Sequence, residues 1–75
     1  MFIYTKRRII NADCIEELRL TETKTGYGIR VTMKSGIDFT IADFDNEADG
    51  EEALNHLFWD IIHNTSTVIE GGGLI

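Results

Sequence analysis

Apolar and polar residues alternate most regularly between residues 27 and 43. The large apolar residues in this stretch have odd numbers, and a period of two is typical of a strand with one buried face. The two alternating runs are separated by Lys34-Ser35-Gly36. A three-residue loop with Gly36 in the left-handed conformation keeps both apolar sets on one face. This hairpin pairs Met33 with Ile37, Val31 with Phe39, and Ile29 with Ile41.

Two further strands are predicted before this hairpin. Leu18 and Leu20 alternate with polar neighbours, and residues 23–26 form the turn into the next strand. Because these leucines have even numbers, the turn must contain an even number of loop residues if all the apolar side chains are to share a face. Residues 2–10 are rich in β-branched and aromatic residues and predict one first strand. It ends at Asn11-Ala12-Asp13, where the Asn and Asp side chains favour a turn.

Residues 46–63 change to helical spacing. One apolar stripe recurs at intervals of three and four residues, as in a helix with one buried side. Asn46 and Asp49 are alternative N-caps, and the helix should end near residues 63–64. The predicted fold class is therefore α+β, a four-stranded antiparallel β-meander with one C-terminal helix packed on its apolar face. The stripe consists of Leu54, Leu57, Phe58, Ile61 and Ile62.

The predicted elements form a single domain over residues 1–64, followed by a glycine-rich apolar tail over residues 65–75. The tail could be an added strand, a packed arm or a frayed end. With 75 residues, the chain buries only about 60% of the surface that it exposes when unfolded. Cys14 is the single cysteine, so no internal disulfide can add stability. Self-association is the usual remaining support for so small a core.

The formal charge of -6 is unevenly distributed. Residues 1–34 contain all seven basic residues and four acidic ones, whereas residues 35–75 contain nine carboxylates and no lysine or arginine. Such a division could steer a charged partner or let copies dock on one another. The simpler interpretation, which we favour because blocks of charge usually mark solvated faces, is a mildly basic sheet beside an acidic helix.

No set of residues in the sequence predicts catalysis, a metal site or a cofactor. The acidic run from Asp45 to Gly50 imitates the start of an EF-hand loop, but the position that needs a bidentate carboxylate is His56. His56 and His63 are two helical turns apart, about 10 Å along the axis, too far to bind one ion. Acidic neighbours disfavour a thiolate at Cys14. We therefore expect a protein that is not an enzyme.

Nucleic acid and membranes are predicted to be poor partners. Lys6-Arg7-Arg8 is basic, but the outer face of the predicted sheet has mixed charges and lacks the aromatic residues on which single strands stack. No apolar run approaches the ~20 residues that span a bilayer. With one cysteine and no export signal, the simplest expectation is a cytoplasmic protein.

The segment Ile10-Asn11-Ala12-Asp13-Cys14-Ile15-Glu16 is similar to the N-A-D-x-I-E element of the small flagellar FlbD-like proteins of bacteria. The resemblance extends over residues 7–62 and implies the same order of elements, a short strand, a bend, a hairpin with a glycine turn and a terminal helix. The stretch before Gly26 is longer here, and a glycine-rich tail follows the helix. The resemblance implies no functional residues.

These observations predict a non-enzymatic protein-interaction module of a bacterium or its phage, one that self-associates as a homodimer. Trp59 is the candidate anchor, because tryptophan is enriched at interface hot spots. The alternative is a nucleic-acid-associated regulator that uses the basic N-terminal half. The predicted interface consists of Trp59 and Ile62 on the helix and of Val68, Ile69, Leu74 and Ile75 in the tail.

Overall fold

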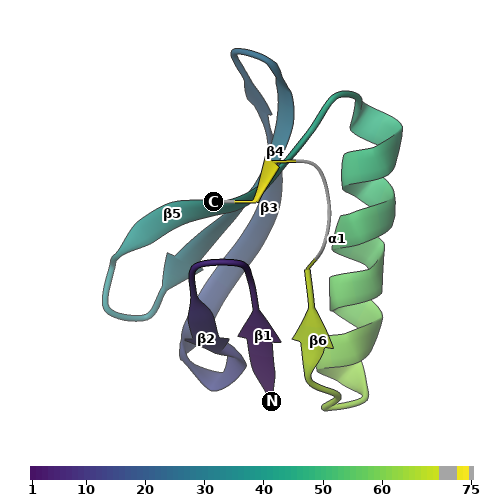
Figure 1. Cartoon of the computed structure of the whole chain (residues 1–75). Coiled ribbons are helices and arrows are strands. Elements are labelled where there is room, and N and C mark those ends of the chain that lie inside the picture. Colours follow the sequence, from purple (N-terminus) through teal and green to yellow (C-terminus); the bar gives the residue numbers. More distant parts are fainter. Residues whose placement is uncertain (70–72, 75) are drawn as a thin grey trace.

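The computed structural model describes residues 1–69 and the strand residues 73–74 (Figure 1). It has an α+β fold with two small sheets and one long helix. One sheet has the order β2-β1-β6, and the other has the order β3-β4-β5-β7. The elements are β1 (Phe2–Tyr4), β2 (Ile9–Asn11), the 3-10 helix η1 (Ala12–Cys14), β3 (Ile15–Thr23), β4 (Gly26–Met33), β5 (Asp38–Phe44), α1 (Glu47–Ile62), β6 (Thr67–Val68) and β7 (Gly73–Leu74).

The predicted continuous first strand is wrong, because residues 2–11 form a hairpin of two three-residue strands. Ile3 of β1 pairs with Ile10 of β2. The hydroxyl of Thr5 accepts hydrogen bonds from the backbone N–H groups of Arg7 and Arg8, at 3.3 and 3.0 Å, and so closes the turn. A four-stranded meander is therefore also wrong, since β1 and β2 leave the meander and form a separate sheet with β6.

The remaining meander, β3-β4-β5, has nearly the predicted register. Thr23 pairs with Gly26 across a two-residue loop, so Leu18 and Leu20 lie opposite Val31 and Ile29. The second turn is the predicted three-residue loop, in which the N–H of Met33 donates to the carbonyl of Ile37 at 2.8 Å and Gly36 has a φ of 93°.

A β-bulge at Ile41 changes the far end of the second hairpin. Val31 pairs with Phe39 as predicted, but Ile29 lies opposite Ala42, not Ile41. The extra residue lets both Ile41 and Ala42 turn into the core, where both are fully buried. Ala42, which simple alternation places on the outer face, is therefore a core residue.

The core lies between the β3-β4-β5 sheet on one side and α1 together with the β2-β1-β6 sheet on the other (Figure 1). The N-terminal hairpin supplies two core residues, and the segment after the helix supplies another. The N-terminal hairpin therefore covers part of the inner face of the β3-β4-β5 sheet. For this reason the helix buries fewer residues than its apolar stripe predicts. The buried set is Ile3, Ile10, Ile29, Val31, Ile41, Ala42, Leu57 and Ile69.

Of the two alternative caps, Asn46 begins the helix. Its side-chain Oδ1 accepts a hydrogen bond of 2.9 Å from the N–H of Asp49. The acidic run thus supplies the first turns of a helix, where the helix dipole stabilises carboxylates. After the helix, β6 pairs in parallel with β1, with Ile3 opposite Thr67, so residues 67–68 are an added strand.

Candidate interaction surfaces

The last two turns of α1 carry four large apolar side chains that remain about half exposed. Phe58, Trp59, Ile61 and Ile62 are between 40% and 54% exposed. Phe58 and Trp59 make an edge-to-face contact with ring centroids 5.6 Å apart, and the imidazole of His63 stacks on Trp59 at 5.8 Å. We call these four residues the helix patch. Apolar groups exposed side by side are typical of an interaction site.

Phe58 and Ile62 of the helix patch lie on the flank of α1 next to β3, whereas Trp59 lies about 200° from the buried Leu57, on the side away from the core. With about 100° per residue, Phe58 and Ile62 lie about 100° and 140° round the helix from the buried Leu57. Gly50 lies about 20° from Leu57 in the same direction, and a Cβ at Gly50 would meet the side chain of Leu20 on β3, so this direction round the helix leads toward β3. Two predicted stripe members on this side, Phe58 and Ile62, are therefore exposed beside an edge strand, and the prediction that they pack on the sheet is wrong.

A second apolar surface covers the outer face of the β2-β1-β6 sheet. Tyr4 lies in the middle, with Ile9 opposite it on β2 and Val68 opposite it on β6. The ring of Phe2 is 6.4 Å from that of Tyr4, measured between centroids. These four side chains, which we call the sheet patch, are between 37% and 72% exposed.

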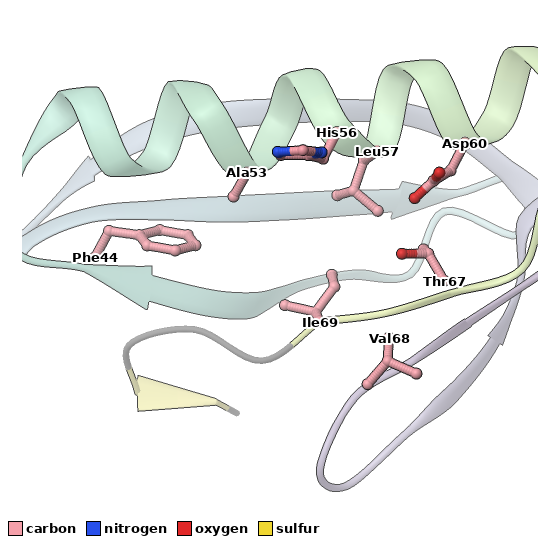
Figure 2. Close-up of a pocket in the computed structure, with 8 residues that line it drawn as sticks. All are labelled: Phe44, Ala53, His56, Leu57, Asp60, Thr67, Val68 and Ile69. Carbon is pink, nitrogen blue, oxygen red and sulfur yellow. The ribbon is translucent and has the colours of Figure 1, made fainter.

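The opposite flank of the helix borders a pocket of about 250 Å³ between α1 and β6 (Figure 2). Apolar side chains form most of its walls, and the polar groups are those of His56, Asp60 and Thr67. Its volume lies below the roughly 300–1,000 Å³ of ordinary ligand pockets. The pocket therefore suits a single inserted side chain better than a small-molecule ligand. Its lining residues are Phe44, Ala53, His56, Leu57, Asp60, Thr67, Val68 and Ile69.

The outer face of the β3-β4-β5 sheet carries a polar network centred on Asp38. Arg19 binds Glu17 at 2.8 Å and Asp38 at 3.3 Å, and Arg30 also forms an ion pair with Asp38. Desolvation alone would raise the pKa of Asp38, but hydrogen bonds from Arg19 and Thr32 and the charge of Arg30 outweigh it and lower that pKa. Arg19 and Arg30 are thus neutralised within the chain and do not form a basic surface.

The residues of the predicted interface are placed differently from one another. Trp59, Ile62 and Val68 are exposed, but Val68 belongs to the sheet patch and not to the helix patch. Ile69 is buried in the chain's own core. Leu74 is in β7, which pairs with β5 through Ala42; its side chain and Ile75 lie outside what the structure describes.

Sequence reasoning missed three members of the sheet patch, Phe2, Tyr4 and Ile9. In the predicted single strand, alternate residues lie on opposite faces, so Phe2 and Tyr4 lie on one face and Ile9 on the other. The three residues then do not form one surface. The available signal was the polar run Thr5-Lys6-Arg7-Arg8 inside an otherwise apolar strand, which is more polar than a buried strand tolerates.

The side chains tested for chemistry are dispersed. Nε2 of His56 is 4.0 Å from a carboxylate oxygen of Glu52, both of them well exposed, and Cys14 is an exposed free thiol. Within residues 1–69 and 73–74, no three His, Cys, Asp or Glu side chains are grouped as metal ligands. No helix in that part of the chain has the length and apolar character needed to cross a membrane.

The geometry therefore offers two apolar surfaces for contact with other molecules, and it assembles no set of reactive groups among the described residues. Comparison with family models, with curated proteins and with solved structures found no match to this chain.

Proposed function

We propose that this protein is a non-enzymatic interaction module that self-associates through the helix patch. The observation that carries the proposal is the exposure of four large apolar side chains in two consecutive turns of α1. Their contact with water costs about 25 cal/mol for each Å² of apolar surface, and a second copy removes this cost. In a two-fold contact each copy presents the same patch, so a single surface satisfies both chains.

Sedimentation velocity over a range of concentrations tests this proposal. We expect the wild-type chain to sediment as a species of twice 8.5 kDa at high micromolar concentration. Ile62→Glu should dissociate it, because a carboxylate placed in the contact cannot be desolvated without a large cost. Ile37→Glu is the matched control, since Ile37 is equally apolar and exposed but lies in the β4–β5 turn.

Trp59 provides an independent measurement, because it is the chain's single tryptophan. Its fluorescence emission should shift to shorter wavelength as the chain is concentrated and the indole leaves water. A wild-type chain that stays at 8.5 kDa, with an unchanged emission maximum, would refute self-association.

The second candidate function is binding of single-stranded nucleic acid, and the sheet patch is the observation that favours it. Phe2 and Tyr4 are exposed aromatic residues on one sheet face, which the sequence had not indicated. The neighbouring turn carries Lys6 and Arg7, and within the described residues neither is within ion-pair distance of a carboxylate. Aromatic stacking with nearby cations is the usual means of holding single strands.

Fluorescence anisotropy with a labelled oligothymidine tests the second candidate. Binding tighter than about 10⁻⁴–10⁻⁶ M that weakens steeply with salt would support it. Tyr4→Ala and Lys6→Ala should then both weaken binding, whereas Lys24→Ala, in the β3–β4 turn, should not. Absence of binding at low salt would leave the sheet patch as a protein-contact surface.

A further inference from the structure

The longest strand, β3, has one edge that no strand of the described residues pairs with. It spans Ile15–Thr23 and lies at the end of the sheet order β3-β4-β5-β7. Proteins usually protect such edges with proline, with lysine or by covering them. The segment 15–23 contains no proline or lysine, but it carries the charged residues Glu16, Glu17, Arg19 and Glu22 and a bulge at its start, between Ile15 and Glu17. Beyond the bulge the edge is regular, and it can accept a strand whose charges oppose its own.

The hydrogen-bonding direction of β3 is fixed by its hairpin with β4. Thr23 and Gly26 close a two-residue loop, so they form a hydrogen-bonded pair. The N–H and C=O groups of successive residues in a strand point in opposite directions. Those of Thr21 and Arg19 therefore also point toward β4. The N–H and C=O groups of Leu18 and Leu20 therefore point to the open edge.

We infer that β3 pairs with β3 of a second copy, antiparallel and about a two-fold axis at Leu18, so that two sheets join edge to edge. This inference rests on the proposed self-association and specifies its geometry. An antiparallel two-fold axis can pass through a hydrogen-bonded or a non-hydrogen-bonded residue pair, so near the middle of the strand it can lie at Leu18, Arg19 or Leu20.

Charge complementarity selects among these three positions, and an axis at Arg19 is disfavoured because it places the Arg19 side chains of the two copies opposite each other. With the axis at Leu18, Glu17 of each copy lies directly opposite the partner's Arg19, which adds two opposite-charge pairs on the outer face beside the contacts of Arg19 with Glu17 and Asp38 of its own chain. With the axis at Leu20, Arg19 lies opposite Thr21 and neither pair forms. Opposite charges placed directly across antiparallel strands stabilise the pairing, so the Leu18 register is favoured.

The same arrangement accounts for the helix patch. A two-fold axis perpendicular to the joined sheet keeps both helices on one face, each with the flank that faces β3 turned toward the other copy. Three strand spacings of about 4.8 Å separate the two β4 strands, about 14 Å in all. Large side chains from both helices, Phe58 and Ile62 above all, fill a gap of this width. One contact thus covers both the open edge and the apolar flank.

Charge-swap variants test the register, measured by sedimentation equilibrium beside the wild-type chain. In Glu17→Arg and in Arg19→Glu, both cross-strand pairs become repulsive, so we expect the dimer Kd of each variant to rise at least about tenfold. An equimolar mixture of the two variants should recover a tight dimer, because the two basic side chains of one chain then face the two acidic side chains of the other. Far-UV circular dichroism of each variant confirms that it is folded.

The mixture separates this inference from simple loss of fold or of a salt bridge. Arg19→Glu also disturbs the contact with Asp38 inside the chain, but mixing cannot repair that damage. If the wild-type chain is dimeric and mixing restores nothing, or if neither variant weakens the dimer, the edge pairing is wrong while self-association stands. If the wild-type chain is monomeric at high micromolar concentration, both the proposed function and the edge pairing fail.

Discussion

The adjacent isoleucines of β2 test the N-terminal hairpin, the element that departs most from the sequence-based expectation. Ile10 is 4% exposed and belongs to the core, whereas Ile9 is 72% exposed on the sheet patch. Ile10→Ala removes three carbons from the core, about 2.4 kcal/mol at about 0.8 kcal/mol for each buried CH₂ group. The cavity that remains raises the loss further, within the usual range of about 2–5 kcal/mol.

Ile9→Ala is the matched control, with the same chemical change one residue away in the same strand. Its cost should stay below about 1 kcal/mol, the full span of strand propensities. A chain of 75 residues has a total stability of about 4–11 kcal/mol, at about 0.05–0.15 kcal/mol per residue. The loss at Ile10 is therefore a large fraction of the whole and easily measured.

Urea unfolding followed by far-UV circular dichroism gives both free energies of unfolding. All proteins must be compared at one concentration, because self-association adds to apparent stability. Equal losses in the two variants, or a larger loss for Ile9→Ala, would show that the hairpin does not present Ile10 to the core. The arrangement of the β2-β1-β6 sheet would then be wrong.

Three further predictions use the same unfolding assay. Gly26→Ala should lower the free energy of unfolding more than Gly36→Ala, because a Cβ at Gly26 would meet a backbone carbonyl of β5. Gly36 has open space around it, so its substitution adds only the strain of a φ of 93°. A larger loss for Gly36→Ala would contradict this. Asn46→Ala should lose about 1 kcal/mol through loss of the N-cap, and Asn55→Ala, exposed in mid-helix, should lose nothing. Asp38 has a folded-state pKa below its ordinary 3.8, so its contribution to stability is present above that pH and is lost as the pH falls through the folded value. The destabilisation caused by Asp38→Asn should accordingly be smaller at pH 3 than at pH 7, and an unchanged difference would contradict the lowered pKa.

The parts of the fold that the sequence predicted are those determined by neighbouring residues. The three-residue loop at Gly36 and the loop with an even number of residues before Gly26 follow from local pattern and turn chemistry, and Asn46 is one of the two N-caps that the sequence left open. The bulge at Ile41 could not be predicted from the sequence. One extra residue leaves the alternation of apolar and polar residues regular on each side of it.

The candidate site was less predictable because it depends on packing between distant segments. Phe58 and Ile62 have the spacing of core residues, and they are exposed because other parts of the chain take the space beside the sheet. Phe39 shows the same effect, since the guanidinium of Arg8 lies 4.1 Å from its ring centroid and covers it from the β1–β2 turn. Such competition between segments for space on the sheet cannot be detected in the apolar periodicity of any single element.

The parallel pairing of β1 with β6 has a consequence for the order of folding. The N–H of Phe2 donates to the hydroxyl of Ser66, 64 residues away, whereas the β3–β4 hairpin closes over two residues. Each doubling of loop length adds about 0.6 kcal/mol of closure entropy, so five doublings add about 3 kcal/mol. The β3-β4-β5 meander should therefore form in the rate-limiting transition state, and the β1–β6 contact should form after it. Destabilising substitutions at Ile3 should accordingly speed unfolding and leave the folding rate nearly unchanged, the reverse of substitutions at Val31.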